Sequence, residues 1–198
     1  NEAICEAFEQ IEQSRGQTSL TYFEFGTLAA LILMAREELD VALLEVGLGG
    51  RLDAVNILDT DIAIVTGVAL DHQEWLGDDL NQIAAEKAAI ARAGKPLICG
   101  DPNPVAGLIG TAEKVGAKLM VNGRDFSAKQ FVPLPETSLP SASIACALQA
   151  TSLITGLTPS EVDTSAIGAV AVPGRFQKVT INGVSVVLDV AHNPQAAA

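Results

Sequence analysis

What this sequence lacks already excludes several classes of protein. It has only 12 Lys and Arg against 24 Asp and Glu, which gives a net charge of −12. Because proteins bind nucleic acids and anionic membranes through a basic face, we expect neither partner. No apolar run approaches the roughly 20 residues that a membrane helix needs, since the longest clean run covers residues 28–35.

Cysteine is also scarce, with Cys5, Cys99 and Cys146 far apart in the chain. An odd number at this spacing provides neither a disulfide framework nor a metal knuckle. Each cysteine lies among apolar residues, so we predict buried free thiols in a reducing, cytoplasmic compartment. Apolar residues make up 48% of the chain, which excludes a disordered protein.

Helical and strand-like segments alternate along the chain. Helices are predicted at 3–11, 21–35, 80–93, 105–115, 142–154 and 159–169, and strands at 41–46, 62–68, 96–99 and 118–121. The segment 21–35 is apolar nearly all round and predicts a buried helix. The alternation predicts an α/β fold, in which a mostly parallel sheet is flanked by helices.

The C-terminal part changes character. Asn182-Gly183 separates two strand-like segments, 177–181 and 184–190, and this pair of residues is typical of a β-hairpin turn. The change from helices to a hairpin predicts a domain boundary. We expect residues 1–174 to form one α/β domain, and residues 175–198 to form a linker and the first strands of a second.

The first candidate site begins at Glu45, which follows a predicted buried strand and precedes a glycine-rich segment at 47–50. In open α/β sheets ligands collect at the carboxyl ends of strands, and glycines let the backbone approach a ligand closely. The alternative is a tight turn with Glu45 in solvent. The segment matches neither a Walker A loop nor a dinucleotide-binding fingerprint.

Other polar residues with candidate chemistry are His72, Lys87, Arg175 and Asp189. His72 follows the predicted strand 62–68 and can ligate a divalent metal beside Glu45, or simply form hydrogen bonds within a loop. Lys87 lies in an alanine-rich helix, where a surface lysine is the usual interpretation. Arg175 can bind a phosphate and Asp189 can accept from ribose hydroxyls, or the two can form an interdomain ion pair.

Taken together, these segments resemble the bacterial bifunctional folylpolyglutamate synthase/dihydrofolate synthase family of the Mur ligase superfamily. The most specific part is 44–54 with Asn56, and supporting segments lie at 20–24, 69–72, 86–87, 173–176 and 189–194. The resemblance implies a Mur-ligase-like central ATPase domain. It also implies an ATP-dependent amide ligase that adds L-glutamate to dihydropteroate or to polyglutamylated tetrahydrofolate through an acyl phosphate.

The same resemblance implies roles for individual residues. Glu45 and His72 match Mg²⁺ ligands, with a second divalent or monovalent cation nearby, and Lys87 matches a lysine that is carried as a carbamate. Two segments match the pterin (folate) site: Thr21, Tyr22, Phe23 and Glu24, and then Leu52, Asp53 and Ala54. The nucleotide positions are Arg175, Asp189 and Ser141, where Ser141 stands in place of a frequent asparagine. His192 matches a catalytic or nucleotide-site histidine.

The resemblance further implies that the phosphate-binding loop and a serine metal ligand precede residue 1, and that most of a C-terminal domain follows residue 198. We therefore expect these 198 residues alone not to turn over ATP. Two alternatives stay open, a Mur-type ligase of a peptidoglycan precursor and an inactive binding fragment. A monomer that uses ATP, L-glutamate and a pterin or folate is the state that the family suggests.

Overall fold

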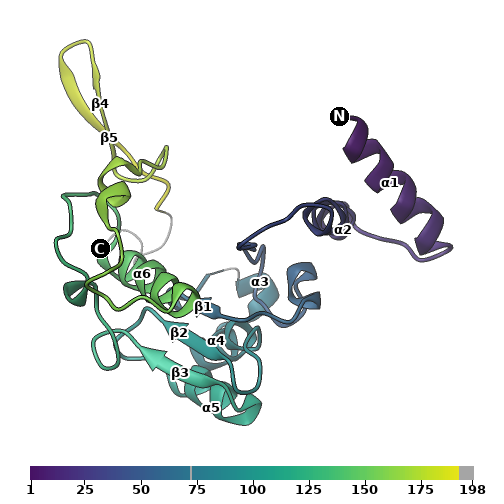
Figure 1. The fold of residues 1–198 in the computed structure, drawn as a ribbon, viewed down its shortest axis with the longest axis horizontal. Coiled ribbons are helices and arrows are strands. Elements are labelled where there is room, and N and C mark those ends of the chain that lie inside the picture. Colours follow the sequence, from purple (N-terminus) through teal and green to yellow (C-terminus); the bar gives the residue numbers. More distant parts are fainter. Residues whose placement is uncertain (72, 192–198) are drawn as a thin grey trace. The chain divides into compact units, whose positions relative to one another are not determined.

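The computed structural model describes residues 1–71 and 73–191, and the chain divides into two compact units, Asn1–Asp59 and Thr60–Ala198 (Figure 1). Each unit has its own core and is described by itself. The domain boundary that the sequence predicts lies between residues 174 and 175, not at the limit between these two units, and it stays a prediction.

The first unit is built around a helical hairpin. Helix α1 (Glu2–Arg15) ends at Gly16, and α2 (Tyr22–Ala35) starts from Thr21 as its N-cap. The two helices pack through Ala7, Ile11 and Ala29, and Phe8 meets Phe25 edge to face, with ring centroids 5.2 Å apart. A loop and a short 3-10 helix, η1 (Ala54–Ile57), complete the unit.

The expected burial of this unit is wrong in two places. Helix α2 buries only Ala29, because α1 and η1 cover one stripe of it and leave the rest partly exposed. Cys5 is exposed, because α1 buries Ala7 and Ile11 and Cys5 lies about 200° around the helix from Ala7.

The predicted strand 41–46 is also wrong. This segment is irregular, and Leu43 is 84% exposed. A run of apolar residues marks a segment that is suited to burial, but a strand forms only where a neighbouring strand completes its hydrogen bonds. Among the residues that the structure describes, none pairs with this segment in a ladder.

The second unit confirms the predicted parallel sheet. Strands β1 (Ala63–Val65), β2 (Pro96–Cys99) and β3 (Lys118–Val121) lie in the order β1-β2-β3, and both pairs are parallel. The predictions for 96–99 and 118–121 match to the residue, whereas the strand predicted at 62–68 is shorter.

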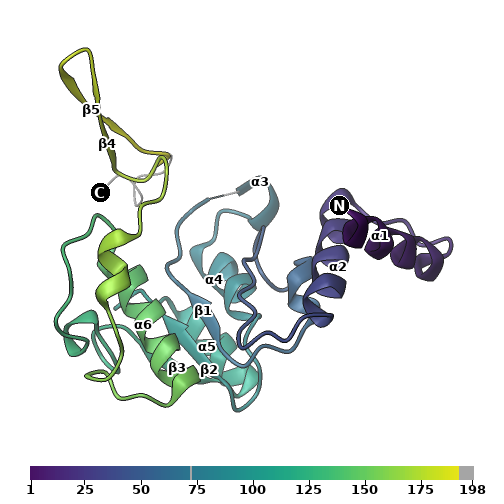
Figure 2. The ribbon, with the colours of Figure 1, turned by 45° about the horizontal axis from the view of Figure 1, so that its top comes forward.

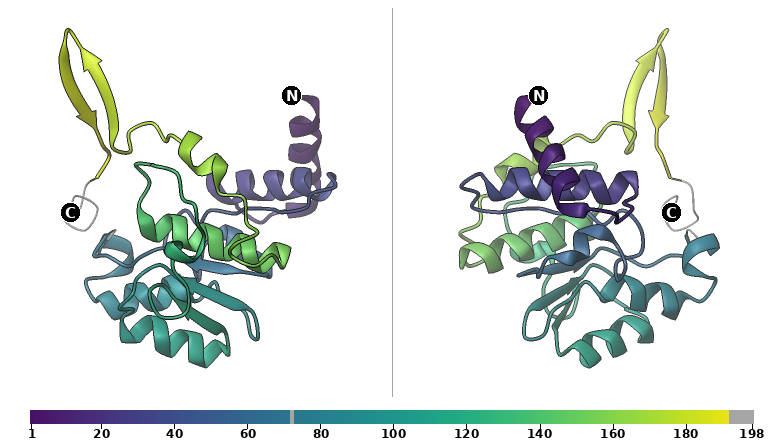
Figure 3. Two further views of the ribbon diagram at one scale, coloured as in Figure 1. Left: turned by 60° about the vertical axis from the view of Figure 1, so that its left-hand side comes forward. Right: turned by 90° about the vertical axis from the view of Figure 1, so that its right-hand side faces the viewer.

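Side chains that alternate along β2 divide the core between two helical layers. Leu97 and Cys99 pack with α4 (Leu80–Ala88) and α5 (Ala106–Val115), whereas Ile98 packs with Ala145 and Cys146 of α6 (Ser141–Thr155). Figure 3 shows these helices on the two sides of the sheet. The central strand is therefore buried on both faces.

Two predicted helices of the second unit are wrong in extent. Helix α4 ends at Ala88 rather than at residue 93, because the chain tightens into i→i−3 bonds and Arg92 donates to the carbonyls of Ile90 and Ala91. The helix expected at 159–169 is only the 3-10 helix η3 (Ser165–Ala169). Asp163 accepts from the backbone N–H of Ser165, and such a local bond competes with a regular helix.

The remaining elements are short. Helix α3 (Gln73–Leu76) and the 3-10 helix η2 (Ala128–Gln130) lie in the connections, and residues 132–140 form a loop. In the described parts of the chain no helix has the length and apolar character to cross a membrane.

The predicted hairpin is confirmed. Strands β4 (Gln177–Ile181) and β5 (Val184–Leu188) are antiparallel, with Ile181 opposite Val184 (Figure 2). Asn182 and Gly183 both have positive φ, 51° and 79°, as a type I′ turn requires.

Helices α4 and α5 approach so closely that Gly107 has no room for a side chain. A Cβ at Gly107 would overlap the backbone of Asn81, and the Gly107 N–H donates to the Asn81 side-chain oxygen at 2.9 Å. We therefore expect Gly107→Ala to lower the free energy of unfolding by about 1–3 kcal/mol in urea denaturation. Gly110→Ala, in the same helix, is the matched control, because its Cβ would meet nothing within 4 Å. Equal destabilisation by both substitutions would contradict this close contact.

Candidate functional site

The glycine-rich segment of the first unit is a loop held by Asp53. Its Oδ2 accepts the backbone N–H groups of Gly47 and Leu48, both at 3.0 Å, and its Oδ1 accepts that of Val55 at 3.0 Å. The last bond makes Asp53 the N-cap of η1. One carboxylate therefore fixes both ends of the segment from residue 47 to residue 55.

Phe23 lies against the same loop. A Cβ at Gly47 would come within 2.9 Å of the Phe23 Cζ and 3.3 Å of the Asp53 Oδ2, so only a glycine fits here without movement. The structure thus brings together 21–24 and 52–54, the two segments that the family resemblance matches to a pterin site.

Thr21 and Glu24 fix the start of α2 with a capping box. Glu24 Oε2 accepts from the Thr21 N–H at 2.7 Å and the Thr21 hydroxyl at 2.8 Å, and the Glu24 N–H donates back to Thr21 Oγ1 at 3.2 Å. These bonds lower the pKa of Glu24. The capped helix presents Tyr22, which is 97% exposed, and Phe23, while Leu52 is exposed on the loop. Exposed rings beside a polar loop can bind a flat aromatic ligand.

The predicted metal pair is described only at Glu45. This carboxylate is exposed and lies directly before the glycine-rich loop, although no strand precedes it. Carboxylate oxygens suit Mg²⁺, so Glu45 fits one position of such a site. His72 lies outside the described residues. Within 1–71 and 73–191, no group of three or more His, Cys, Asp or Glu side chains could hold a metal ion.

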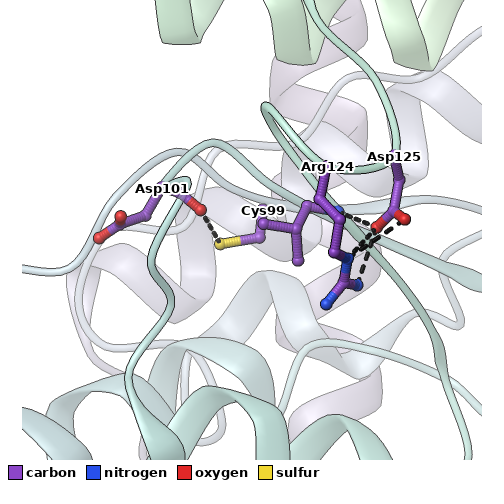
Figure 4. Close-up of polar contacts among 5 residues, drawn as sticks. Cys99, Asp101, Arg124 and Asp125 are labelled. Carbon is purple, nitrogen blue, oxygen red and sulfur yellow. Dashed lines mark hydrogen bonds and ion pairs between the residues drawn. The ribbon is translucent and has the colours of Figure 1, made fainter.

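In the second unit, the carboxyl end of the sheet is closed by loops. The Cys99 thiol lies 3.5 Å from the Asp101 carbonyl oxygen, to which it donates, and Asp125 Oδ2 accepts from the Val121 N–H at 2.7 Å and pairs with Arg124 (Figure 4). The Asn122 side chain donates to the Gly100 carbonyl at 3.1 Å. Sequence reasoning missed these contacts; the bond from Asn122 to Gly100 joins residues that are 22 positions apart and meet only after folding.

The buried thiols at this edge are structural. Burial raises the pKa of Cys99, and it raises the pKa of Cys146 to about 11 with a contribution from Cys99. Because a thiolate is the reactive form, both thiols stay protonated and unreactive at neutral pH. Of the cysteines, Cys99 and Cys146 are buried as expected.

Lys87 and Ser141 occupy helix ends in this unit. Lys87 is half-buried in the last turn of α4, directly before the buried Ala88. Ser141 is the exposed first residue of α6.

Arg175 and Asp189 lie near each other at the open end of the β4–β5 hairpin. Asp189 Oδ2 accepts from the Phe176 N–H at 2.6 Å, and its Oδ1 accepts from the Ala191 N–H at 2.7 Å. These donors lower the pKa of Asp189, and the charge of Arg175 lowers it further. His192, which follows, lies outside the described residues.

A pocket of about 360 Å³ opens beside this turn. Its walls come from the 132–140 loop and the chain entering β4, and the lining residues are Ser138, Ala171, Val172, Pro173, Arg175, Phe176, Gln177 and Lys178. Two of these residues are basic and none is acidic, so the pocket suits an anionic ligand.

Comparison with known proteins gives one consistent result. The chain is 44% identical over 207 aligned residues to the dihydrofolate synthase/folylpolyglutamate synthase of Escherichia coli K12, covering 96% of this chain and 48% of that protein. It is 34% identical to the Haemophilus influenzae protein of the same name, covering 100% of this chain and 51% of that protein. The chain thus spans about half the length of these relatives. No protein-family profile matches it.

Solved structures agree. The bifunctional folylpolyglutamate synthase/dihydrofolate synthase of Yersinia pestis, complexed with AMPPNP and Mn ion, matches with a TM-score of 0.86 and 42% identity over 98% of this chain and 50% of that one. Escherichia coli FolC in complex with DHPP and ADP also matches with a TM-score of 0.86, at 43% identity, over 98% and 50% of the two chains. The α/β fold expected from the sequence is therefore confirmed.

The role of Asp53 in the loop leads to a prediction. Asp53→Ala removes the carboxylate that accepts from three backbone N–H groups and should lower the stability of the first unit by about 0.5–2 kcal/mol, the usual cost of a lost N-cap. Asp53→Asn keeps one acceptor oxygen and should cost less. Hydrogen exchange reads out the loop directly: the amides of Gly47, Leu48 and Val55 should all exchange faster in Asp53→Ala. Unchanged exchange at Gly47 and Leu48 would show that Asp53 does not hold the loop.

Proposed function

We infer that this chain forms part of an ATP-dependent ligase, because it is a homologue of the bacterial dihydrofolate synthase/folylpolyglutamate synthases. This ligase joins L-glutamate to the carboxylate of dihydropteroate or of a folate. The observation that carries the proposal is the 44% identity to the Escherichia coli protein over 96% of the chain. The two pterin segments of the sequence prediction also meet at one loop.

The chemistry follows from the weakness of a carboxylate as an electrophile. A carboxylate oxygen of the pterin or folate attacks the γ-phosphorus of ATP, ADP leaves, and an acyl phosphate forms. The glutamate amine then attacks the carbonyl carbon, the bond to phosphate breaks, and the amine loses a proton as the amide forms. A bound divalent cation would neutralise the phosphate charge.

The first unit would supply the pterin site. Tyr22, Phe23 and Leu52 offer exposed apolar surface, Ala54 adds a small contact, and Thr21, Glu24 and Asp53 supply polar groups beside it. A pterin has a flat ring with polar edges, so apolar surface next to a carboxylate suits it. The structure bound to DHPP and ADP shows that a homologue takes such ligands.

The second unit would supply nucleotide contacts. Arg175 lines the pocket, and its guanidinium can pair with phosphate oxygens. Ser141 can hydrogen-bond a nucleotide from the start of α6, and we assign a catalytic or nucleotide-site role to His192 from the resemblance. Asp189 lies beside Arg175 at the same turn.

For the metal we propose Mg²⁺, held by Glu45 and His72, with a second cation nearby; the Yersinia pestis structure holds Mn. We further propose that Lys87 carries a carbamate. A lysine ammonium near a metal would be repelled, whereas the neutral amine can add CO₂ and lose a proton to become an anion. We propose a cytoplasmic monomer, as the family resemblance suggests.

A ligation assay tests the function. Purified full-length protein with ATP, Mg²⁺, L-glutamate and dihydropteroate or tetrahydrofolate should form the glutamyl amide and release one ADP per amide. Activity on a UDP-linked peptidoglycan precursor instead would overturn the proposal. Binding of nucleotide with no ligation of any of these substrates would favour the inactive binding fragment.

Arg175 should act in the phosphoryl-transfer step. Removing one group that stabilises developing charge commonly costs about 10²–10³ in kcat. We therefore expect Arg175→Ala to lower kcat by that order while dihydropteroate affinity stays close to wild type. Arg124→Ala is the control, because Arg124 pairs with Asp125 at the surface. Equal losses in kcat and in dihydropteroate affinity would contradict this role.

The carbamate on Lys87 should be visible and necessary. With ¹³C-bicarbonate, the protein should show a carbamate carbon resonance that is lost in Lys87→Ala. That substitution should lower activity by about 10–100-fold, and a short carboxylic acid should restore part of it. Lys114→Ala is the matched control, since Lys114 lies in the last turn of α5 and is exposed. A resonance that persists in Lys87→Ala would exclude the assignment.

A further inference from the structure

The turn that leads into β4 has an unusual backbone. Phe176 has a positive φ of 44°, a conformation that is strained for an ordinary L-residue and persists only where the surroundings hold it. Gly174, two residues earlier, has a φ of 69°. Arg175 therefore lies between two left-handed residues, and its direction depends on what holds the turn.

The bonds that hold the turn come largely from the hairpin. The Val190 N–H donates to the Gly174 carbonyl at 2.8 Å, and the Gly174 N–H donates to the Gln177 side chain at 2.9 Å. Asp189 Oδ2 accepts from the strained residue itself, Phe176, at 2.6 Å. The second oxygen of Asp189 accepts from Ala191 at 2.7 Å, which fixes the carboxylate in place.

Asp189 occupies a particular position in the ladder. Gln177 pairs with Leu188 as the last pair of the hairpin, so Phe176 and Asp189 are the next two residues outward. Beyond the last backbone pair of the ladder, the Asp189 side chain accepts the next hydrogen bond, from the Phe176 N–H. Unlike Arg175, Phe176 and Lys178, it is absent from the described residues that line the pocket.

We propose that Asp189 is a positioning residue that holds Phe176 in its left-handed conformation and thereby directs Arg175 into the nucleotide pocket. The inference rests on the proposed function. It assigns Asp189 an action through Arg175, whereas the family resemblance assigns it a contact with ATP. A chain that loses this bond relaxes at Phe176, and Arg175 leaves the pocket.

The first test reads the bond without nucleotide. Asp189→Ala removes both acceptor oxygens, so the backbone N–H groups of Phe176 and Ala191 lose their side-chain partner. Hydrogen exchange at the Phe176 amide should become faster than in the wild type, while the amides of β2 stay unchanged. The kcat should fall about tenfold, the scale of one hydrogen bond to a charged group, because a displaced Arg175 no longer acts in the phosphoryl-transfer step. Unchanged exchange at Phe176 would overturn the proposal.

The second test separates positioning from direct contact. Glycine adopts a positive φ without strain, so Phe176→Gly should make the turn independent of Asp189. Asp189→Ala should therefore lower kcat much less in the Phe176→Gly background than in the wild type. Each ratio is taken within its own background, so the loss of the Phe176 ring cancels.

The outcomes are distinct. Equal ratios in the two backgrounds would show a direct contact between Asp189 and the nucleotide and would overturn the inference while leaving the proposed function intact. A wild-type full-length protein that binds neither ATP nor ADP would overturn the proposed function, and the inference with it. A ratio near one in the Phe176→Gly background supports the positioning role.

Discussion

Backbone N–H groups in irregular loops need acceptors, and at the candidate sites of this protein three aspartates accept from six of them. Asp53 takes three such groups in the glycine-rich loop, Asp189 takes two at the turn before β4, and Asp125 takes that of Val121 at the end of β3. An unpaired backbone donor costs free energy once water leaves it, and a short carboxylate reaches nearby donors without a long flexible side chain. Residues on loops can carry chemistry here because their backbones are fixed in this way.

Much of the second unit is readable from the sequence. Residues 96–99 form a short apolar run between glycines, and both faces of that strand are buried, so its pattern and its structure agree. The hairpin follows from Asn182-Gly183. The turn requires a positive φ at both positions, which few other pairs of residues adopt. The predictions for residues 41–46 and 159–169 were wrong, because hydrogen bonds that the local apolar pattern does not reveal decided the structure there. Residues 41–46 have the composition of a strand, but composition does not supply a pairing partner. At 159–169 a local bond from Asp163 outweighs the helical pattern.

The candidate site likewise has features that the sequence predicts and features that it does not. Motifs point to Thr21, Asp53, Arg175 and Asp189 as important, and the structure brings 21–24 beside 52–54 and Arg175 beside Asp189. The sequence does not reveal what each carboxylate accepts, because that depends on where the N–H groups of residues 47, 48, 55 and 176 converge after folding. Asp53 and Asp189 stand out in the sequence as polar residues within motifs. In the structure, both carboxylates accept hydrogen bonds from backbone N–H groups. The predicted metal pair of Glu45 with His72 stays a prediction.

We propose that this chain carries separate contacts for a pterin and for a nucleotide. Hydrogen exchange of the full-length protein, measured with dihydropteroate alone and with ATP and Mg²⁺ alone, tests it directly. We expect dihydropteroate to slow exchange in residues 21–24 and 47–55, and the nucleotide to slow it in residues 172–178. Protection of one common set by both ligands, or protection of neither set, would contradict the account.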